Sequence, residues 1–299
     1  SDTQNSYAIR AQFQADFSER FSGRLILGYA EKDLRPMTGD VFLSDASREV
    51  IDNAGGQLTI PNDPSDRTVE YGDEITFESE SNDVVLNLEY GADAYTLTSI
   101  TSYDDYESLN GIHDVEQQSL FVADFNDVQI GDSFSQELRV ASNDGLLFNW
   151  LAGAFYYTNS FIRGDRDLPE FIIEEDADEY GDAVADALIS QGVLPTTLLP
   201  VVVPVLGVPG DRGDYYIEQD TESFGLFSKL DFSFSERWKM SLGLRYSYEE
   251  KTGKVNQSNQ TSPLGCVPPL NTNLICAVTP NGNNFDQTND FDAVTGSLS

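Results

Sequence analysis

The fold is decided by residues 238–249, which read Trp-Lys-Met-Ser-Leu-Gly-Leu-Arg-Tyr-Ser-Tyr-Glu. The even-numbered residues of this stretch are apolar or aromatic, and the odd-numbered ones are polar, charged or glycine. Successive side chains of a strand point to opposite faces, so the alternation produces one apolar and one polar face. A helix would scatter the same residues around its circumference. The stretch is therefore predicted to be a β-strand.

The same alternation recurs along the whole chain. In residues 7–17, the odd-numbered positions hold Tyr, Ile, Ala and Phe, and most of the even-numbered positions hold Arg, Gln or Asp. About nine strands are predicted in this way, and the chain is expected to be all-β. They cover residues 7–17, 23–31, 84–90, 94–103, 134–141, 148–158, 223–234, 238–249 and 292–298.

Short and long connections alternate between these strands. Turns of a few residues rich in Ser, Asn, Asp and Gly join the strands into hairpins. The hairpins are separated by long polar segments, at residues 32–83, 104–133, 159–222 and 250–291. Such loops are unusual in a compact soluble domain. They are typical of outer-membrane barrels, which have short periplasmic turns and long extracellular loops.

The predicted fold class is therefore an antiparallel transmembrane β-barrel segment. The strand lengths match the roughly 9–11 tilted residues that cross a membrane. Aromatic residues gather towards the strand ends, where interfacial girdles place them. A soluble β-sandwich would show similar alternation with its apolar face inwards, so the asymmetry of the loops decides between the two.

The amino-acid composition excludes some classes of function. The 299 residues include 51 acidic and 17 basic ones, a formal net charge of -34. This excludes a nucleic-acid binder, which must neutralise phosphates. The charge favours cationic or metal-bearing partners, although adaptation to saline water would produce the same composition. His113 is the only histidine, so catalytic or metal sites built on histidine are not expected, and neither is enzyme activity.

The two cysteines, Cys266 and Cys276, lie ten residues apart in a polar stretch rich in Asn, Pro and Thr. We expect a local disulfide between them, which would place the segment in an oxidising, extracytoplasmic compartment. Two free thiols are the alternative.

The segment 159–222 is the most unusual of the long connections. Acidic residues 174–179 precede apolar residues at helical spacing, and Gly192 ends the pattern, which predicts a short helix. The helix could act as a lid over a barrel mouth or pack against neighbouring loops. Asp176 and Asp178 resemble the start of a calcium loop, but Tyr180 occupies the third ligand position. No metal-binding, cofactor-binding or catalytic residue is assigned.

Several strand sequences resemble one family, the TonB-dependent outer-membrane receptors, particularly the type found in alphaproteobacteria and marine proteobacteria. The resemblance depends on an ordered set of segments rather than on a single motif. These are residues 135–142 (Ser-Gln-Glu-Leu-Arg-Val-Ala-Ser), 150–157 (Trp-Leu-Ala-Gly-Ala-Phe-Tyr-Tyr), 224–227 (Phe-Gly-Leu-Phe), 242–246 (Leu-Gly-Leu-Arg-Tyr) and 250–251 (Glu-Lys).

The resemblance implies a 22-stranded barrel, an N-terminal plug domain and TonB-energised uptake of a scarce nutrient. A ferric siderophore is the leading candidate, with haem, cobalamin or an oligosaccharide as alternatives. Residues 1–299 are then expected to be part of the barrel domain, without the plug or the C-terminal strands. The expected partners are the TonB complex through the missing plug, membrane lipid and a small-molecule or metal-chelate substrate. The competing hypothesis is a secreted, acidic, calcium-stabilised β-rich binding or adhesion module.

Overall fold

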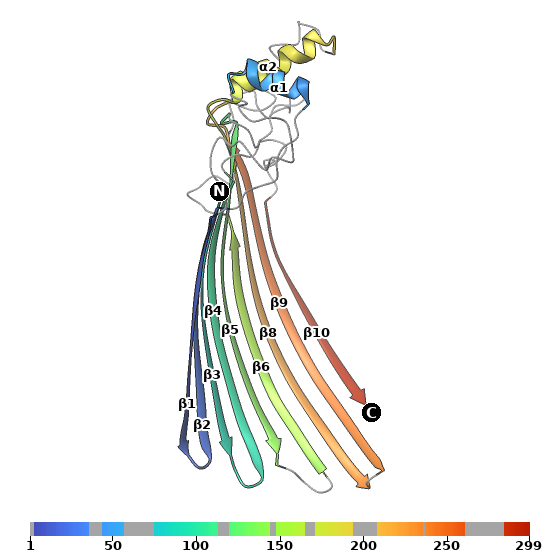
Figure 1. Cartoon of the computed structure of the whole chain (residues 1–299). Coiled ribbons are helices and arrows are strands. Elements are labelled where there is room, and N and C mark those ends of the chain that lie inside the picture. The colour runs from blue at the N-terminus through green and yellow to red at the C-terminus, as the bar shows by residue number, and fades with distance from the viewer. Residues whose placement is uncertain are drawn as a thin grey trace.

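The computed structural model describes most of the chain, and Figure 1 shows its arrangement. The described residues are 3–35, 44–56, 75–112, 120–143, 148–164, 171–193, 208–235, 237–260 and 284–299.

The strands form one continuous antiparallel sheet, visible in Figure 1 as a tall, curved wall. Its order is β1-β2-β3-β4-β5-β6-β8-β9-β10, and the short β7 pairs with β5 and β8. All nine predicted strands are confirmed. The bounds are β1 Thr3–Ser18, β2 Phe21–Arg35, β3 Thr76–Gly91, β4 Tyr95–Ile112, β5 Ala123–Ser142, β6 Phe148–Arg163, β7 Phe171–Ile173, β8 Arg212–Ser235, β9 Trp238–Gln260 and β10 Phe285–Leu298.

The strands extend much further into the long connections than the sequence predicted. The whole of β4 pairs with β5, from Tyr95 opposite Ser142 to Ile112 opposite Phe125. The expected loop 104–133 was therefore too long, because most of it belongs to this ladder. In the extensions polar residues occur at both odd and even positions, so alternation does not reveal them, whereas the backbone hydrogen bonds continue regardless of side-chain polarity.

Strand length separates a membrane part from an extracellular part. β8 contains 24 residues, more than twice the roughly 9–11 that cross the hydrocarbon when tilted. The upper parts of the long strands in Figure 1, on the side of the long connections, therefore exceed the length that is needed to cross a membrane.

Register gathers the apolar parity of every strand on one side, which we call the outer face. Phe13 lies opposite Leu25, which lies opposite Leu86. In the same way, Leu226 lies opposite Tyr246. Phe13 is 60% exposed although it is large and apolar, which is expected of a side chain that contacts lipid. The opposite parity, with Arg24 and Asn87 directly opposed, forms the inner face.

Aromatic residues border the apolar band of the outer face at both ends, as membrane interfaces favour. We call the border nearer the long connections the upper girdle. The upper girdle consists of Tyr29, Tyr103, Phe134, Tyr156, Phe224 and Tyr248, and the lower border includes Phe17, Tyr90, Tyr95, Phe148, Phe232 and Trp238.

Two helices stand above the strands (Figure 1): α1, Asp45–Asn53, and α2, Ala177–Ser190. The helix predicted after residues 174–179 is confirmed by α2, whereas α1 and β7 were not predicted. Ser44 caps α1 by accepting a hydrogen bond from the backbone N–H of Ser47 at 3.1 Å. Neither helix is long and apolar enough to span a membrane.

The helices share a small hydrophobic core with the upper ends of β5 and β7, and we call this unit the cap. Its buried residues are Ile51, Ala54, Leu120, Val122, Ala123, Phe171, Ile173, Ala177 and Ala183. Ala123 and Phe125 have the parity of the inner face and lie opposite Ile173 and Phe171. The cap core therefore continues the inner face upwards, and α2 packs against α1 from another long connection.

Candidate functional site

Above the upper girdle, the inner face of β5, β6, β8, β9 and β10 forms one continuous wall. Register places its side chains together: Arg163 lies opposite Ile217, Tyr215 opposite Gln257, and Val255 opposite Phe285. We call this surface the inner wall.

The charged groups on the inner wall occur as pairs. Arg163 Nε lies 2.7 Å from Asp127 Oδ1, and the Asp127 side chain is only 10% exposed. Gln129 Nε2 donates a second hydrogen bond to Asp127 at 2.8 Å. The Arg163 guanidinium also lies 5.9 Å from the centre of the Tyr215 ring, within the range of a cation–π contact. The charges of Arg163 and Asp127 thus cancel each other, and each side chain has a further contact with a neighbouring side chain.

A hollow of about 710 Å³ opens on the inner wall between β8, β9 and β10, a volume within the range of small-molecule pockets. Asn284 Oδ1 accepts a hydrogen bond from the backbone N–H of Gln257 at 2.9 Å and so ties β10 to β9 beside it. Most of the lining is aromatic, aliphatic or amide. The lining residues are Tyr215, Ile217, Glu218, Gln219, Gly253, Lys254, Val255, Gln257, Asn284 and Phe285.

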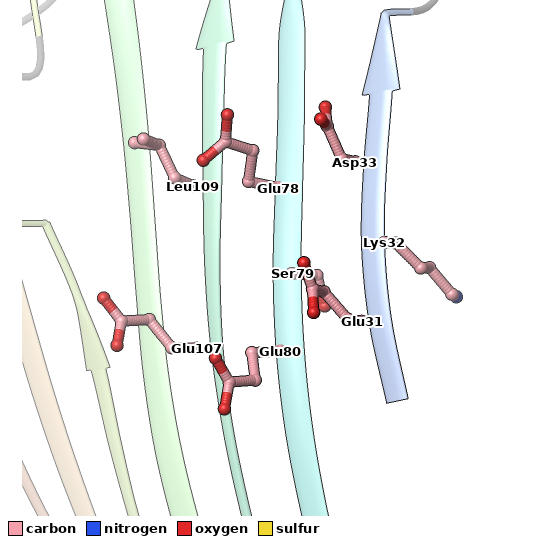
Figure 2. Close-up of a pocket in the computed structure, with 8 residues that line it drawn as sticks. All are labelled: Glu31, Lys32, Asp33, Glu78, Ser79, Glu80, Glu107 and Leu109. Carbon is pink, nitrogen blue, oxygen red and sulfur yellow. The ribbon is translucent and has the colours of Figure 1, made fainter. Parts of the chain in front are cut away.

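The opposite, outer face is strongly acidic at the same height. Glu31 lies directly opposite Glu80, which lies opposite Glu107. Together with Asp33 and Glu78 they line a groove of about 400 Å³. Figure 2 shows these carboxylates on one side of β2, β3 and β4, while Lys32 points away from them.

Carboxylates follow the upper girdle on most strands of the outer face. The Tyr29 hydroxyl donates to Glu31 Oε2 at 3.0 Å, and Tyr248 donates to Glu250 Oε2 at 3.2 Å. We call this row the acidic collar. It consists of Glu31, Asp105, Asp132, Glu222, Glu250 and Asp290.

The acidic collar and the groove together place ten carboxylates on the outer face, away from the inner wall. The cation of Lys254 is held there too, because its Nζ donates to Glu218 Oε1 at 3.1 Å. This hydrogen bond, followed by the charge of Glu218, raises the pKa of Lys254.

The calcium-like sequence at Asp176 and Asp178 serves the cap instead. Asp176 Oδ2 accepts a hydrogen bond from the backbone N–H of Phe121 at 2.9 Å and so joins the start of α2 to the segment that precedes β5. Burial, followed by the charges of Glu179, Asp182 and Asp211, raises the pKa of Asp178. Within the described ranges, no three His, Cys, Asp or Glu side chains gather in a metal-binding arrangement.

Three residues singled out from the sequence, His113, Cys266 and Cys276, lie outside the described residues. Conversely, sequence reasoning missed Arg163, Tyr215, Gln257 and Phe285, which belonged to expected loops. If the predicted strands had been extended upwards, the alternation along each strand would have placed these residues on the inner face.

Three comparisons place the chain among known proteins. Residues 16–299 match the family model described as "TonB dependent receptor-like, beta-barrel". No curated protein matches the chain. Two solved structures with a similar fold are the ferric yersiniabactin uptake receptor FyuA from Yersinia pestis, with a TM-score of 0.54 and 11% identity, and the siderophore receptor PiuA from Acinetobacter baumannii, with 0.55 and 13%.

Both alignments cover 99% of this chain, but only 34% of the first structure and 40% of the second. The chain thus spans between a third and two fifths of the length of these structures. At such low identity the likeness concerns the fold alone.

Proposed function

Because this chain belongs to the TonB-dependent receptor family, in the region of its β-barrel, we propose that it forms part of the barrel wall of a nutrient-uptake receptor. The family consists of outer-membrane transporters rather than enzymes. The match over residues 16–299 carries the proposal. The lipid-facing apolar band supports it, and both argue against the alternative of a secreted, calcium-stabilised module.

The proposed substrate is a ferric siderophore, with haem, cobalamin or an oligosaccharide as alternatives. Support for a siderophore comes from the two similar structures, which are receptors for siderophores by their own descriptions. The inner wall supports a small ligand because its hollow has the volume of one.

The sheet is proposed to be one arc of a closed, 22-stranded barrel around a plug that contacts the TonB complex. β1 and β10 are the two edges of the sheet, and the side chains of β10 are exposed along the whole strand. An open edge leaves backbone N–H and C=O groups unpaired, which the hydrocarbon region does not tolerate. Further strands must therefore pair with both edges in the membrane.

Uptake of iron by cells that carry the complete receptor tests this proposal. An iron-starved strain with the receptor gene intact should accumulate radioactive iron from ferric siderophores, and deletion of either the receptor gene or the TonB gene should abolish that uptake. Uptake that continues at the same rate without TonB would contradict the mechanism. Uptake of haem, cobalamin or an oligosaccharide without uptake of a ferric siderophore would mean that the proposed substrate is wrong.

A disulfide between Cys266 and Cys276 is proposed as well, because the pair closes a short polar loop of an extracytoplasmic protein. Mass spectrometry of a non-reduced digest should recover one peptide pair linked by these cysteines. Full alkylation of both thiols without prior reduction would contradict it.

A further inference from the structure

The two halves of the cap are attached to the sheet in different ways. One half consists of β7 and α2, and we call it the seat. Besides the pairing of β7 with β5 and β8, the backbone N–H of Glu174 donates to the carbonyl oxygen of Val122 at 2.8 Å. The backbone N–H of Asp176 donates to the carbonyl oxygen of Phe121 at 2.9 Å. These bonds continue the backbone pairing of the sheet, so the seat is part of the wall.

The other half, α1, reaches the seat through apolar side chains. Ile51 is 2% exposed and Ala54 is 8% exposed in the shared core, and Val50 packs against it. In the described chain, the backbone hydrogen bonds of residues 44–56 stay within that segment. Ile51 is the single buried residue of α1, whereas four residues of α2 are buried. Few buried contacts and no shared ladder make α1 the part of the cap that opens at the lowest free energy.

α1 packs on the side of the sheet that the inner face occupies. The core beneath it includes inner-face side chains of β5 and β7, because Ala123 lies opposite Ile173 and Phe125 lies opposite Phe171. Figure 1 shows both helices above the strands. In the proposed barrel the inner face lines the lumen, so α1 on its seat covers the upper inner face of β5.

We infer that α1 is a displaceable lid: it leaves the seat while the seat stays folded, and substrate reaches the upper inner face of β5 only when α1 is displaced. The inference rests on the proposed function and adds a control of its entrance. Since the seated helix and the substrate exclude each other there, the apparent affinity is reduced in proportion to the fraction of receptors that are open. Weakening the contact between α1 and the seat should therefore strengthen binding.

Hydrogen exchange of the complete receptor, purified in detergent, tests whether α1 opens separately. Ile51→Ala removes the side chain that anchors α1, so amides of α1 should exchange roughly tenfold faster or more, and those of β7 and α2 should stay unchanged. Glu49→Gln is the matched control, because Glu49 is exposed on the same helix, and it should change neither. Equal acceleration in α1, β7 and α2, or none in α1, would overturn the lid.

Binding to the same receptors tests whether the lid controls entry. The probes are a ferric trishydroxamate and a ferric triscatecholate, and quenching of tryptophan fluorescence reports their affinities. The chelate that the parent binds should bind about threefold more tightly or better to Ile51→Ala, and with unchanged affinity to Glu49→Gln. Unchanged or weaker binding by Ile51→Ala would overturn the lid but not the proposed function. A parent that binds neither chelate would overturn the siderophore proposal, and hydrogen exchange would still decide whether α1 opens.

Discussion

At the residue scale, the most unusual feature of the outer face is a polar cluster inside the apolar band. Thr101 Oγ1 donates to Gln136 Oε1 at 2.6 Å, and Gln136 Nε2 donates to Ser99 Oγ at 3.1 Å. All three residues have the parity of the exposed outer-face side chains Leu97 and Leu138, which we propose contact lipid. Because lipid offers no hydrogen bonds, these groups must satisfy one another.

Replacing one partner of the cluster should cost more than replacing both. Thr101→Val leaves Gln136 Oε1 without its donor and should lower the free energy of unfolding by about 1–3 kcal/mol. Adding Gln136→Leu should recover most of that loss, because no amide then remains unsatisfied in lipid. Urea unfolding of the receptor in lipid vesicles measures both.

Two serines on the inner face provide a control for these outer-face variants. Ser102 and Ser135 lie opposite each other with their hydroxyl oxygens 2.7 Å apart, but on the polar face, where water can replace a lost partner. Ser102→Ala should therefore cost clearly less than Thr101→Val. Equal costs would mean that the outer-face cluster does not contact lipid.

At the element scale, the strands and the cap are stabilised by different interactions. The strands have continuous backbone ladders and expose their apolar side chains on the outer face, whereas the cap has a core of its own around Ile173, which is 1% exposed. β7 joins the two, because Phe171 pairs with Phe125 where β6 has already ended. The cap is thus a soluble-type unit attached to a membrane sheet.

Truncating the cap core should loosen the cap and leave the membrane strands intact. Ile173→Ala removes a fully buried side chain and should destabilise the cap by about 2–5 kcal/mol. Hydrogen exchange should accelerate in α1 and α2 and stay unchanged in the lower parts of β8 and β9. Ile172→Ala, on the opposite face of β7 and only half-buried, should have a much smaller effect; faster exchange in the membrane strands as well would contradict the separation.

At the scale of the whole molecule, negative charge is unevenly distributed between the two faces of the wall. On the outer face, like charges lie directly opposite each other, as Glu80 and Glu107 do, which destabilises a sheet. The inner wall is nearly balanced by its ion pairs. The acidic groove and the acidic collar therefore affect the stability of the sheet more than the charge of the inner wall.

Salt should stabilise the protein as a consequence. Raising the ionic strength from about 0.01 M to about 1 M shortens the Debye length from roughly 30 Å to roughly 3 Å, so repulsion between outer-face carboxylates weakens. The urea midpoint of the receptor in uncharged detergent should rise with sodium chloride. The variant Glu80→Gln/Glu107→Gln should start from a higher midpoint and respond less; a midpoint that falls with salt in the parent would contradict this explanation.

The sequence by itself determined the strands that carry the apolar outer face. Alternation in segments such as residues 238–249 identified every membrane strand, its two faces and the hairpins, because the lipid on one side demands an apolar residue at every second position. The acidic stretch before α2 was enough to predict that helix. Residues of the family-like segments indicated the family before any fold was known.

Only the tertiary structure decided how far the strands extend, where α1 and β7 lie and which side chains line the inner wall. Above the membrane both faces meet water, so side-chain polarity no longer indicates where a strand runs. There the hydrogen-bonded pairing of the backbones and its register determine how the strands continue. Arg163, Tyr215, Gln257 and Phe285 come from four separate strands and meet because of that register. The separation of charge between the two faces likewise depends on which residues are paired across strands, which composition alone does not contain.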